Sequence, residues 1–434
     1  MVTSSHEIIN ILSGMDKNDP EITKLKINEV KISVNDAKKL STIISKNTYL
    51  RYLNLRECNI SNRCMKYLMA GLQKNSSITE LVLDYVKITS YKIQYVKKML
   101  EKNNYLEYLS LEACCIDNNC LEFLVYGLKR NTTLKYLNLH GNNFPISTMF
   151  SKLILYNRGI ETIDTSIISN LYLYGSSSCN GLKNALGINT TLKKLNMKHV
   201  YLEDKIYNAL KNCNLEVLNI YDNNIKIIKL ANSIKNNISL KKISFNINIS
   251  EVSDDINYFF NIINDINLEE LEIITSNSNI IHPIAEHLKK FKLKRIELDL
   301  CGTYDNESIQ NFCEGINLNT SLKSLTIFMA STYFLECFSK IVIDNTTLEI
   351  LDLMDSELCN NEVKSVVNII KNNKFLKEIH MDNIKDDYQV NQIKKALKNN
   401  VTLKKLKGID VGDMLSPEKI AERRNKLLTK SSRK

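Results

Sequence analysis

Two histidines, His282 and His287, are the residues of this chain whose spacing comes nearest to that of a metal site. They stand in the run His-Pro-Ile-Ala-Glu-His, five positions apart. Two histidines of one helix that hold a zinc ion are spaced by about four, as in HExxH, because residues i and i+4 share a helix face. We therefore expect no metal site at this run.

Cysteines are the second group that could do chemistry, and the chain has 11 of them. The densest group, Cys114, Cys115 and Cys120, lacks the Cys-x-x-Cys spacing of zinc and redox sites. Four cysteines are better interpreted as small core residues, namely Cys64, Cys120, Cys213 and Cys313. An odd number of cysteines favours a reducing compartment, so we expect a cytoplasmic protein.

Signatures of catalysis are missing from the sequence. It contains no phosphate-binding loop, no Gly-x-Gly-x-x-Gly and no recognisable Ser-His-Asp pattern. We therefore predict that the chain is not an enzyme, with no catalytic residue, no metal and no cofactor.

The formal net charge of +10 is partly concentrated at the C-terminus. Residues 416–434 hold seven Lys and Arg against Glu418 and Glu422, which leaves a mild excess for the other residues. Because no basic stripe is obvious there, we expect no nucleic-acid partner. No apolar run reaches the roughly 18 residues of a membrane helix, and the N-terminus does not have the pattern of a signal peptide. The basic tail offers a nuclear address as the alternative to the cytoplasm.

A repeat organises the elements that must position any site. The phrase Asn-x-x-Leu-x-x-Leu-x-Leu recurs, first at Asn47 with Leu50, Leu53 and Leu55. The first four spacings between repeats are 28 residues. The anchors lie at Ile22, Leu50, Ile78, Leu106, Leu134, Ile160, Leu192, Leu215, Leu240, Leu268, Leu293, Leu322, Leu348, Leu376 and Leu403. Such a period predicts a solenoid rather than a domain with one central core.

Each repeat has two halves. Alternation through Leu53 and Leu55 predicts a short strand with one buried face. Three positions after the strand comes a small side chain that can satisfy backbone groups, at Cys58, Cys114, Asn142, Asn223 and Cys301. The second half shows the spacing of an amphipathic helix, as in 65, 68, 69 and 72. The Asn that follows a helix, such as Asn47, Asn75 or Asn131, is expected to take the left-handed conformation.

This pattern resembles the ribonuclease-inhibitor type of leucine-rich repeat, found in cytosolic ribonuclease inhibitor, NOD-like receptors and the Ran GTPase-activating protein. The resemblance implies an α/β horseshoe of about 15 repeats of about 28 residues, with a parallel β-sheet on the concave face and helices on the convex face. We place an N-terminal helical cap at 1–19, the repeat domain at 20–412 and a basic tail at 413–434. The irregular unit near Ile160, with Gly175 to Ser178, is either a hinge or a weak repeat.

Residues that flank the buried strand positions should point from the concave face. Tyr52, Tyr108 and Tyr136 share one column there, and Tyr is favoured at protein interfaces. The alternative is that they only pack against neighbouring strands. Acidic residues follow in the later repeats, after several lysines, and the alternative is a solvated face. The candidate partner-binding set is Tyr52, Arg56, Tyr108, Tyr136, His140, Tyr221, Glu270, Glu272, Glu297, Asp299 and Asp352.

These features favour a monomeric, non-catalytic scaffold that holds a protein partner on its concave face. One alternative is a GTPase-activating or other regulatory protein, for which Arg56 is the only arginine in the N-terminal concave columns. Pairing of Arg56 with Glu57, Glu80 or Asp84 is the plainer interpretation. A recognition subunit of a sensor or effector is the other alternative.

Overall fold

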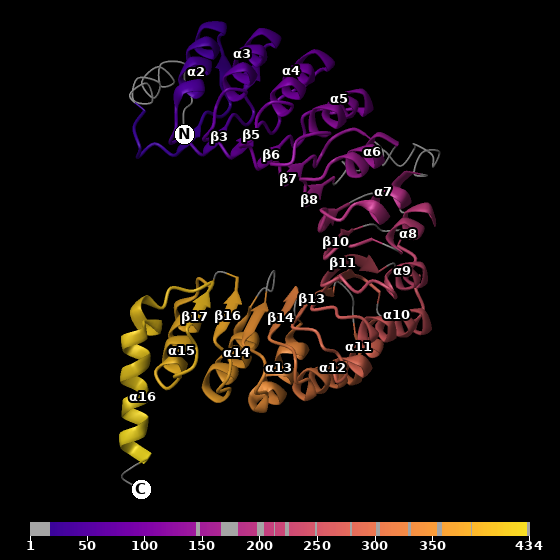
Figure 1. Cartoon of the computed structure of the whole chain (residues 1–434). Helices are drawn as coiled ribbons and strands as arrows, with labels where there is room; N and C mark the ends of the chain where they lie inside the picture. The colour runs from indigo at the N-terminus through magenta and orange to yellow at the C-terminus, as the bar shows by residue number, and fades with distance from the viewer. Residues whose placement is uncertain are drawn as a thin grey trace. The chain divides into compact units, whose positions relative to one another are not determined.

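The computed structural model (Figure 1) describes residues 18–144, 148–165, 181–197, 204–211, 213–221, 225–247, 250–277, 280–300, 304–328, 331–353, 358–382 and 384–431. The chain divides into two compact units. The first holds residues 1–222 and 236–240, and the second holds residues 223–235 and 241–434.

In the first unit, short parallel strands alternate with helices. The strands are β1 (Lys24–Lys26), β3 (Tyr52–Asn54), β5 (Glu80–Val82), β6 (Tyr108–Ser110), β7 (Tyr136–Asn138), β8 (Thr162–Asp164), β9 (Lys194–Asn196) and β10 (Val217–Ile220). The helices are α2 (Val34–Lys46), α3 (Asn62–Leu72), α4 (Ser90–Leu100), α5 (Asn118–Leu128), α6 (Thr148–Tyr156), α7 (Leu182–Ile188) and α8 (Asp204–Leu210). A separate parallel pair joins β2 (Lys31–Ile32) to β4 (Asn59–Ile60).

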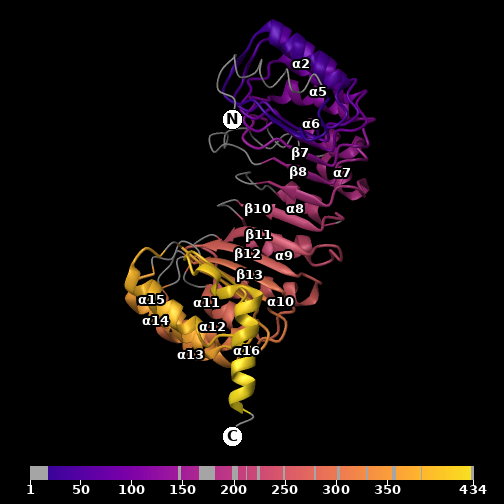
Figure 2. The same cartoon turned by 90° about the vertical axis from the view of Figure 1, so that its left-hand side faces the viewer.

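The second unit repeats this alternation with longer strands (Figure 2). The strands are β11 (Lys242–Ile247), β12 (Glu270–Thr275), β13 (Arg295–Leu300), β14 (Ser324–Phe328), β15 (Ile350–Leu353), β16 (Glu378–Met381) and β17 (Lys405–Lys407). The α-helices are α9 (Ile227–Ile234), α10 (Ser253–Asp265), α11 (Ile281–Leu288), α12 (Asn306–Leu318), α13 (Thr332–Ile341), α14 (Asn360–Asn372), α15 (Asp387–Leu397) and α16 (Pro417–Ser431). Two 3-10 turns, η3 (Val342–Asp344) and η4 (Gly412–Leu415), complete it.

The strand order follows the chain order, and the paired strands among the described residues run parallel. Among the described residues, fifteen strands follow this order, eight in the first unit and seven in the second. In each unit the helices cover one face of the sheet and leave the other face open (Figure 1). The predicted leucine-rich-repeat architecture of about 15 repeats is therefore confirmed, while the predicted cap, repeat-domain and tail boundaries stay predictions.

The core lies between the sheet and the helices of each repeat. Leu53 and Leu55 of one repeat are fully buried, and so are Met65 and Leu68 of the helix that follows. Burying one such side chain contributes roughly 1.5–3 kcal/mol. Because each repeat contacts its neighbours rather than a common centre, this gain recurs along each unit.

The asparagine after each helix does not take the left-handed conformation that the sequence analysis expected. Asn47, Asn189 and Asn373 have φ near −72° and extended ψ. The reason for asparagine is hydrogen bonding. In Asn131, Oδ1 accepts from the backbone N–H of Leu134 at 2.9 Å, and Nδ2 donates to the carbonyl of Leu100 at 2.9 Å. The side chain therefore joins the start of its own strand to the helix end of the preceding repeat.

The small polar side chain after the strand has the role expected from the sequence. Sγ of Cys58 lies 3.0 Å from the carbonyl oxygen of Ile27, and Sγ of Cys114 lies 3.0 Å from that of Leu83. Asn142 donates to the carbonyl of Leu111 at 2.7 Å. Asn223 and Cys301, expected to do the same, lie outside the described residues.

Left-handed backbone occurs instead one position before this side chain. Glu29, Glu57, Tyr85 and Ala113 all have φ between 51° and 60°, and Gly141 has φ 69°. The N–H of each of these four non-glycine residues donates to a carbonyl of the following repeat, for example Tyr85 to Glu112 at 2.7 Å. The repeat geometry therefore imposes a conformation that costs an L-residue roughly 1–2 kcal/mol.

Other predicted segments are described only in part. Residues 1–17 of the expected cap and the irregular stretch with Gly175 lie outside the described residues. The basic tail forms helix α16 as far as Ser431. Within the described ranges, no helix has the length and apolar character needed to cross a membrane.

Candidate functional site

The open face of the first unit is lined by side chains in register across adjacent strands. Pairing places Lys24 beside Tyr52, Tyr52 beside Glu80, Glu80 beside Tyr108 and Tyr108 beside Tyr136. The predicted tyrosine column therefore exists, but Glu80 interrupts it.

Tyr108 and Tyr136 form a stacked pair on β6 and β7. Their ring centroids are 4.7 Å apart and their planes are inclined by 16°. Both side chains are half-buried. Burial raises the pKa of both phenols, and that of Tyr136 reaches about 12 because Asp164 adds to the effect. The pair is a flat, neutral, partly exposed platform that a partner could cover at low entropic cost.

Tyr52 lies apart from this pair and has its own contacts. Asn54 donates to its hydroxyl at 2.9 Å, and Nζ of Lys26 lies 5.8 Å from its ring centroid. It is also half-buried. The three tyrosines therefore contribute two separate aromatic patches rather than one stripe.

Arg56 is held by its neighbours, as the plainer interpretation of the sequence expected. Its Nε lies 3.0 Å from Glu57 Oε1, and one terminal nitrogen lies 4.0 Å from Asp84 Oδ2. The guanidinium also sits over the Tyr85 ring, 4.4 Å from its centroid. These contacts give Arg56 a structural role at the end of β3.

A polar network continues from Asp84 across the first unit. Its carboxylate accepts from the Ser110 hydroxyl and, at 3.1 Å, from the backbone N–H of Glu112. Asn138 donates to Ser110 Oγ at 3.0 Å. Burial raises the pKa of Asp84, although these hydrogen bonds oppose the rise. The sequence alone did not predict this network, because its members come from three different repeats.

The last two candidates of this unit are placed differently. His140 is half-buried, and its backbone N–H donates to Asn138 Oδ1 at 2.8 Å. Tyr221 follows β10 and keeps only 9% of its surface exposed. Tyr221 therefore offers much less contact area than the Tyr108 and Tyr136 pair.

The open face of the second unit carries the predicted acidic residues, but cations lie between them. Nζ of Lys242 lies 3.1 Å from Glu272 and 3.9 Å from Glu270. Ser244 also donates to Glu272 at 2.7 Å. The two carboxylates on β12 thus share one lysine of the neighbouring strand.

Glu297 is an acidic side chain of this face in a setting that disfavours its charge. Burial raises its pKa, and the neighbouring Glu272 raises it further, although Arg295 at 3.0 Å acts in the opposite direction. Asp299 lies two residues along β13, between Ile274 and Phe328 of the adjacent strands. Asp299 is therefore paired with an apolar residue on each adjacent strand.

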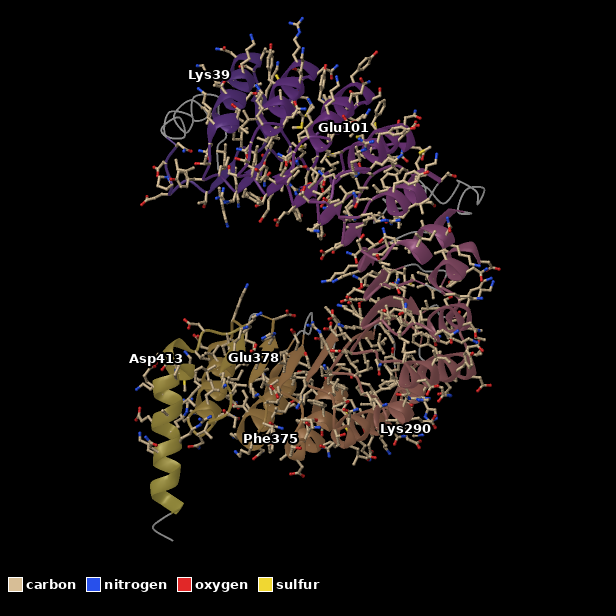
Figure 3. The ribbon with its side chains drawn as sticks, in the orientation of Figure 1. Lys39, Glu101, Lys290, Phe375, Glu378 and Asp413 are labelled. Atoms are coloured by element: carbon tan, nitrogen blue, oxygen red, sulfur yellow. The ribbon has the colours of Figure 1, made fainter. Side chains whose placement is uncertain are left out.

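Asp352 belongs to a cluster that the sequence analysis did not assemble. The ring of His380 joins its Oδ2, at 2.9 Å, to Glu378 Oε2, at 3.1 Å. Lys405 reaches the same Glu378 oxygen at 3.2 Å. Figure 3 labels Glu378 on the strand side of this unit. The sequence pattern could have predicted this cluster. Aligning the repeats places His380 beside Asp352 and Lys405 beside Glu378.

A second charge row, also missed, runs just before the strands. Glu349 binds Lys377 at 2.6 Å and Lys323 at 3.6 Å, and Lys294 binds Glu269 at 2.7 Å. In the first unit, Lys135 pairs with Glu161 and Lys193 with Glu216. Such exposed pairs contribute little each, about 0–1 kcal/mol, but they make the edge of each sheet polar.

His282 and His287 of helix α11 have different surroundings. His282 is exposed and pairs with Glu286 at 3.5 Å. His287 is buried, stacks with Phe291, lies tilted against Phe260, and has its pKa lowered by burial. Across the described ranges, no three potential metal ligands come together.

Repeats of one short parallel strand and one helix, joined by asparagine and cysteine hydrogen bonds, define a leucine-rich-repeat solenoid. In agreement, the family model described as "Leucine Rich repeat" matches residues 46–69. These residues span the end of α2, strand β3 and most of α3.

Comparison with solved structures gives two examples of similar chains. The "Leiomodin-1 Actin-Binding Site 2 (ABS2)" structure is 24% identical, covers 33% of this chain and 80% of its own, and has a TM-score of 0.28. The "TLR13-ssRNA13 complex" is 16% identical, covers 91% of this chain and has a TM-score of 0.47. This chain spans 54% of the length of that second protein. No curated protein matches.

Proposed function

We propose that the protein is a non-catalytic scaffold of the ribonuclease-inhibitor type that binds a protein partner on the open face of its sheets. The observation that carries the proposal is the stacked pair of Tyr108 and Tyr136, a rigid amphipathic surface at the centre of the first unit. Aromatic side chains that are partly exposed in the free protein are favoured as anchors in protein interfaces.

In this proposal the acidic residues of the second unit determine which partner binds, and they are here called the selector. Glu270 and Glu272 share Lys242, and Asp352 shares His380, so each carboxylate has a fixed position. Fixed charges favour partners with a complementary pattern and speed encounter more than they add affinity. The cytoplasm is the proposed location, since the nine cysteines of the described residues are free thiols. The proposed state is a monomer.

Affinity purification of the full chain, compared with a Tyr108→Ala, Tyr136→Ala variant, tests the anchor. A matched control carries Tyr333→Ala and Tyr388→Ala, two exposed tyrosines of helices α13 and α15. The proposal expects one protein to be lost from the first variant and retained by the control. Retention by both variants would contradict the anchor.

The selector is tested with Glu270→Lys and Glu272→Lys, against a control with Glu286→Lys and Glu307→Lys on helices α11 and α12. We expect the association rate of the recovered partner to fall in the first variant alone, and the fall to shrink at high salt. An equal effect in both variants would assign the change to net charge rather than to this face.

A further inference from the structure

The helices of the first unit carry an uneven charge. The five segments 34–46, 62–74, 90–102, 118–130 and 148–158, here called the basic helical face, hold fourteen Lys and Arg against three Asp and Glu. This excess of eleven is larger than the net charge of +10 for the whole chain. The charge of the chain therefore lies on this face as well as in the tail.

The three acidic residues do little to neutralise it. Asp36 is buried and accepts from the Ser33 hydroxyl at 2.6 Å. Glu101 pairs with Lys97 at 3.5 Å, and Glu122 accepts from the Tyr126 hydroxyl at 3.4 Å. Most of the cations, including the Lys39 labelled in Figure 3, therefore remain in solvent without a carboxylate.

Overall composition does not explain this bias. Helices α10, α11, α12 and α13 of the second unit hold seven Asp and Glu and one lysine, Lys340. The other helices of the second unit are not acidic, since α9, α14 and α15 together hold five lysines against Glu362 and Asp387. Charge in the second unit therefore varies from helix to helix, whereas all five segments of the first unit are basic. The basic helical face is a local property of five consecutive repeats.

Exposed tyrosines lie among the cations of this face. Tyr91, Tyr126 and Tyr156 are exposed by 69%, 53% and 40%. A lysine of the preceding repeat lies over several rings, with distances from Nζ to the centroid of 5.4 Å for Lys38 and Tyr67, 5.7 Å for Lys97 and Tyr126, and 5.1 Å for Lys129 and Tyr156. Positive charge and flat rings therefore recur together from repeat to repeat.

The chemistry of this face favours one class of partner. Protein interfaces have a charge-depleted centre, which fourteen cations do not provide. Membrane insertion uses exposed aliphatic or bulky apolar side chains, and among the described residues of α2 to α6 the exposed large apolar side chains are tyrosines alone. Cations that track phosphates, interleaved with rings on which unpaired bases stack, are the combination that binds single-stranded nucleic acid.

We propose that the basic helical face binds single-stranded nucleic acid, with lysines on the phosphates and Tyr91 and Tyr126 on the bases. No nucleic-acid partner was expected from the sequence because no basic stripe is obvious along the chain. The stripe becomes visible only when the helices of successive repeats are stacked. The proposal concerns the covered side of the sheet and does not depend on the function proposed for the open side.

Fluorescence anisotropy of the full chain with a labelled single-stranded RNA of mixed sequence tests this binding. We expect Lys39→Glu, Lys66→Glu and Lys98→Glu together to weaken binding by more than tenfold. They should also make the slope of log K against log salt shallower by roughly 2, at about 0.7 per phosphate contact. The control carries Lys290→Glu, Lys371→Glu and Lys395→Glu, three exposed lysines of the second unit, and should leave both quantities nearly unchanged.

The role of the rings is tested with Tyr91→Ala and Tyr126→Ala. Loss of each stacked base corresponds to roughly five- to 150-fold in affinity. We expect this loss for the single strand and much less for a duplex of the same sequence, whose bases are not free to stack. Unfolding midpoints in urea are measured for every variant, and Lys→Gln changes replace Lys→Glu where the fold is weakened.

Three results would overturn the proposal. The first is the absence of binding at about 50 mM salt, where phosphate contacts are strong. The second is an equal loss in the Lys290, Lys371, Lys395 control. The third is binding of phosphatidylserine vesicles or polyglutamate as tight as that of RNA and unaffected by the tyrosine changes, which would assign the face to membranes or to acidic proteins.

Discussion

Asn103 and Leu72 are joined across one repeat by a hydrogen bond of 2.7 Å from Nδ2 to the backbone carbonyl. The other end of the Asn103 side chain accepts from the N–H groups of Tyr105 and Leu106 at 2.9 and 2.8 Å. Nδ2 also donates to the Asn75 carbonyl at 3.3 Å, so one buried amide bonds four backbone groups near a helix end and a strand start. The same arrangement recurs at Asn75, Asn131, Asn157, Asn189, Asn319, Asn345, Asn373 and Asn400.

The first prediction is that Asn103→Ala strongly destabilises the first unit. Removing the amide takes the acceptor from the N–H groups of Tyr105 and Leu106, at about 1–3 kcal/mol for each group left unsatisfied before relaxation. The Leu72 carbonyl keeps only its 3.2 Å bond from the Asn75 N–H. We expect a loss of roughly 3 kcal/mol in the free energy of unfolding, measured in urea. The neighbouring Asn104 is exposed, so Asn104→Ala is the control and should change stability by less than about 0.5 kcal/mol.

The fold was largely predictable because its determinants are local and periodic. Leu53 and Leu55 alternate within one strand, and the same pattern returns 28 residues later at Leu81 and Leu83. The conformation of Asn47 was not predictable from its residue type, since asparagine suits both a left-handed turn and a hydrogen-bonded cap. The deciding contacts come from the adjacent repeat.

The candidate site was predictable only in part, for the same reason. The column of Tyr52, Tyr108 and Tyr136 follows from the repeat period. The stack of Tyr108 on Tyr136 could also be predicted, because the period places these two residues side by side on adjacent strands. The ties of Arg56 to Asp84, and of His380 to Asp352, depend on side-chain directions across strands. The predicted partner-binding role of these residues stays a prediction.

The second prediction concerns the titration of Tyr136. Its folded pKa of about 12 lies above the usual value near 10, because burial and then Asp164 disfavour the phenolate. The folded state therefore holds this proton more tightly, and its contribution to stability is present below pH 10 and is lost as the pH rises through 12. Tyr136→Phe, which keeps the ring stack, should flatten this part of the stability profile. An unchanged profile would contradict the assignment.

The third prediction compares two glutamates of opposite behaviour. Burial and Glu272 raise the pKa of Glu297, so its charge weakens the fold once the pH exceeds that pKa. Glu297→Gln should therefore stabilise the protein at pH 7, by roughly 1 kcal/mol, and the gain should vanish below about pH 4.5. Urea midpoints across this pH range measure it.

Glu269 supplies the matched comparison. Its hydrogen bond with Lys294 lowers the pKa, and the carboxylate therefore stabilises the fold above its unfolded pKa and loses that effect as the pH falls. Glu269→Gln should give a small destabilisation at pH 7, since the pair is exposed. Changes of the same sign in both variants would show that net charge, rather than local contacts, governs the response.

The last prediction uses the left-handed backbone of the first unit. Glu29 has φ 60° and is exposed, so its side chain contributes little to the fold. Glycine has no penalty at this φ, whereas an L-residue loses roughly 1–2 kcal/mol, partly offset by the greater freedom of glycine in the unfolded chain. Glu29→Gly should therefore raise the free energy of unfolding by up to about 1 kcal/mol. Glu29→Ala removes the same side chain but keeps the strain, and should not stabilise; an equal gain in both variants would locate the effect in the side chain instead.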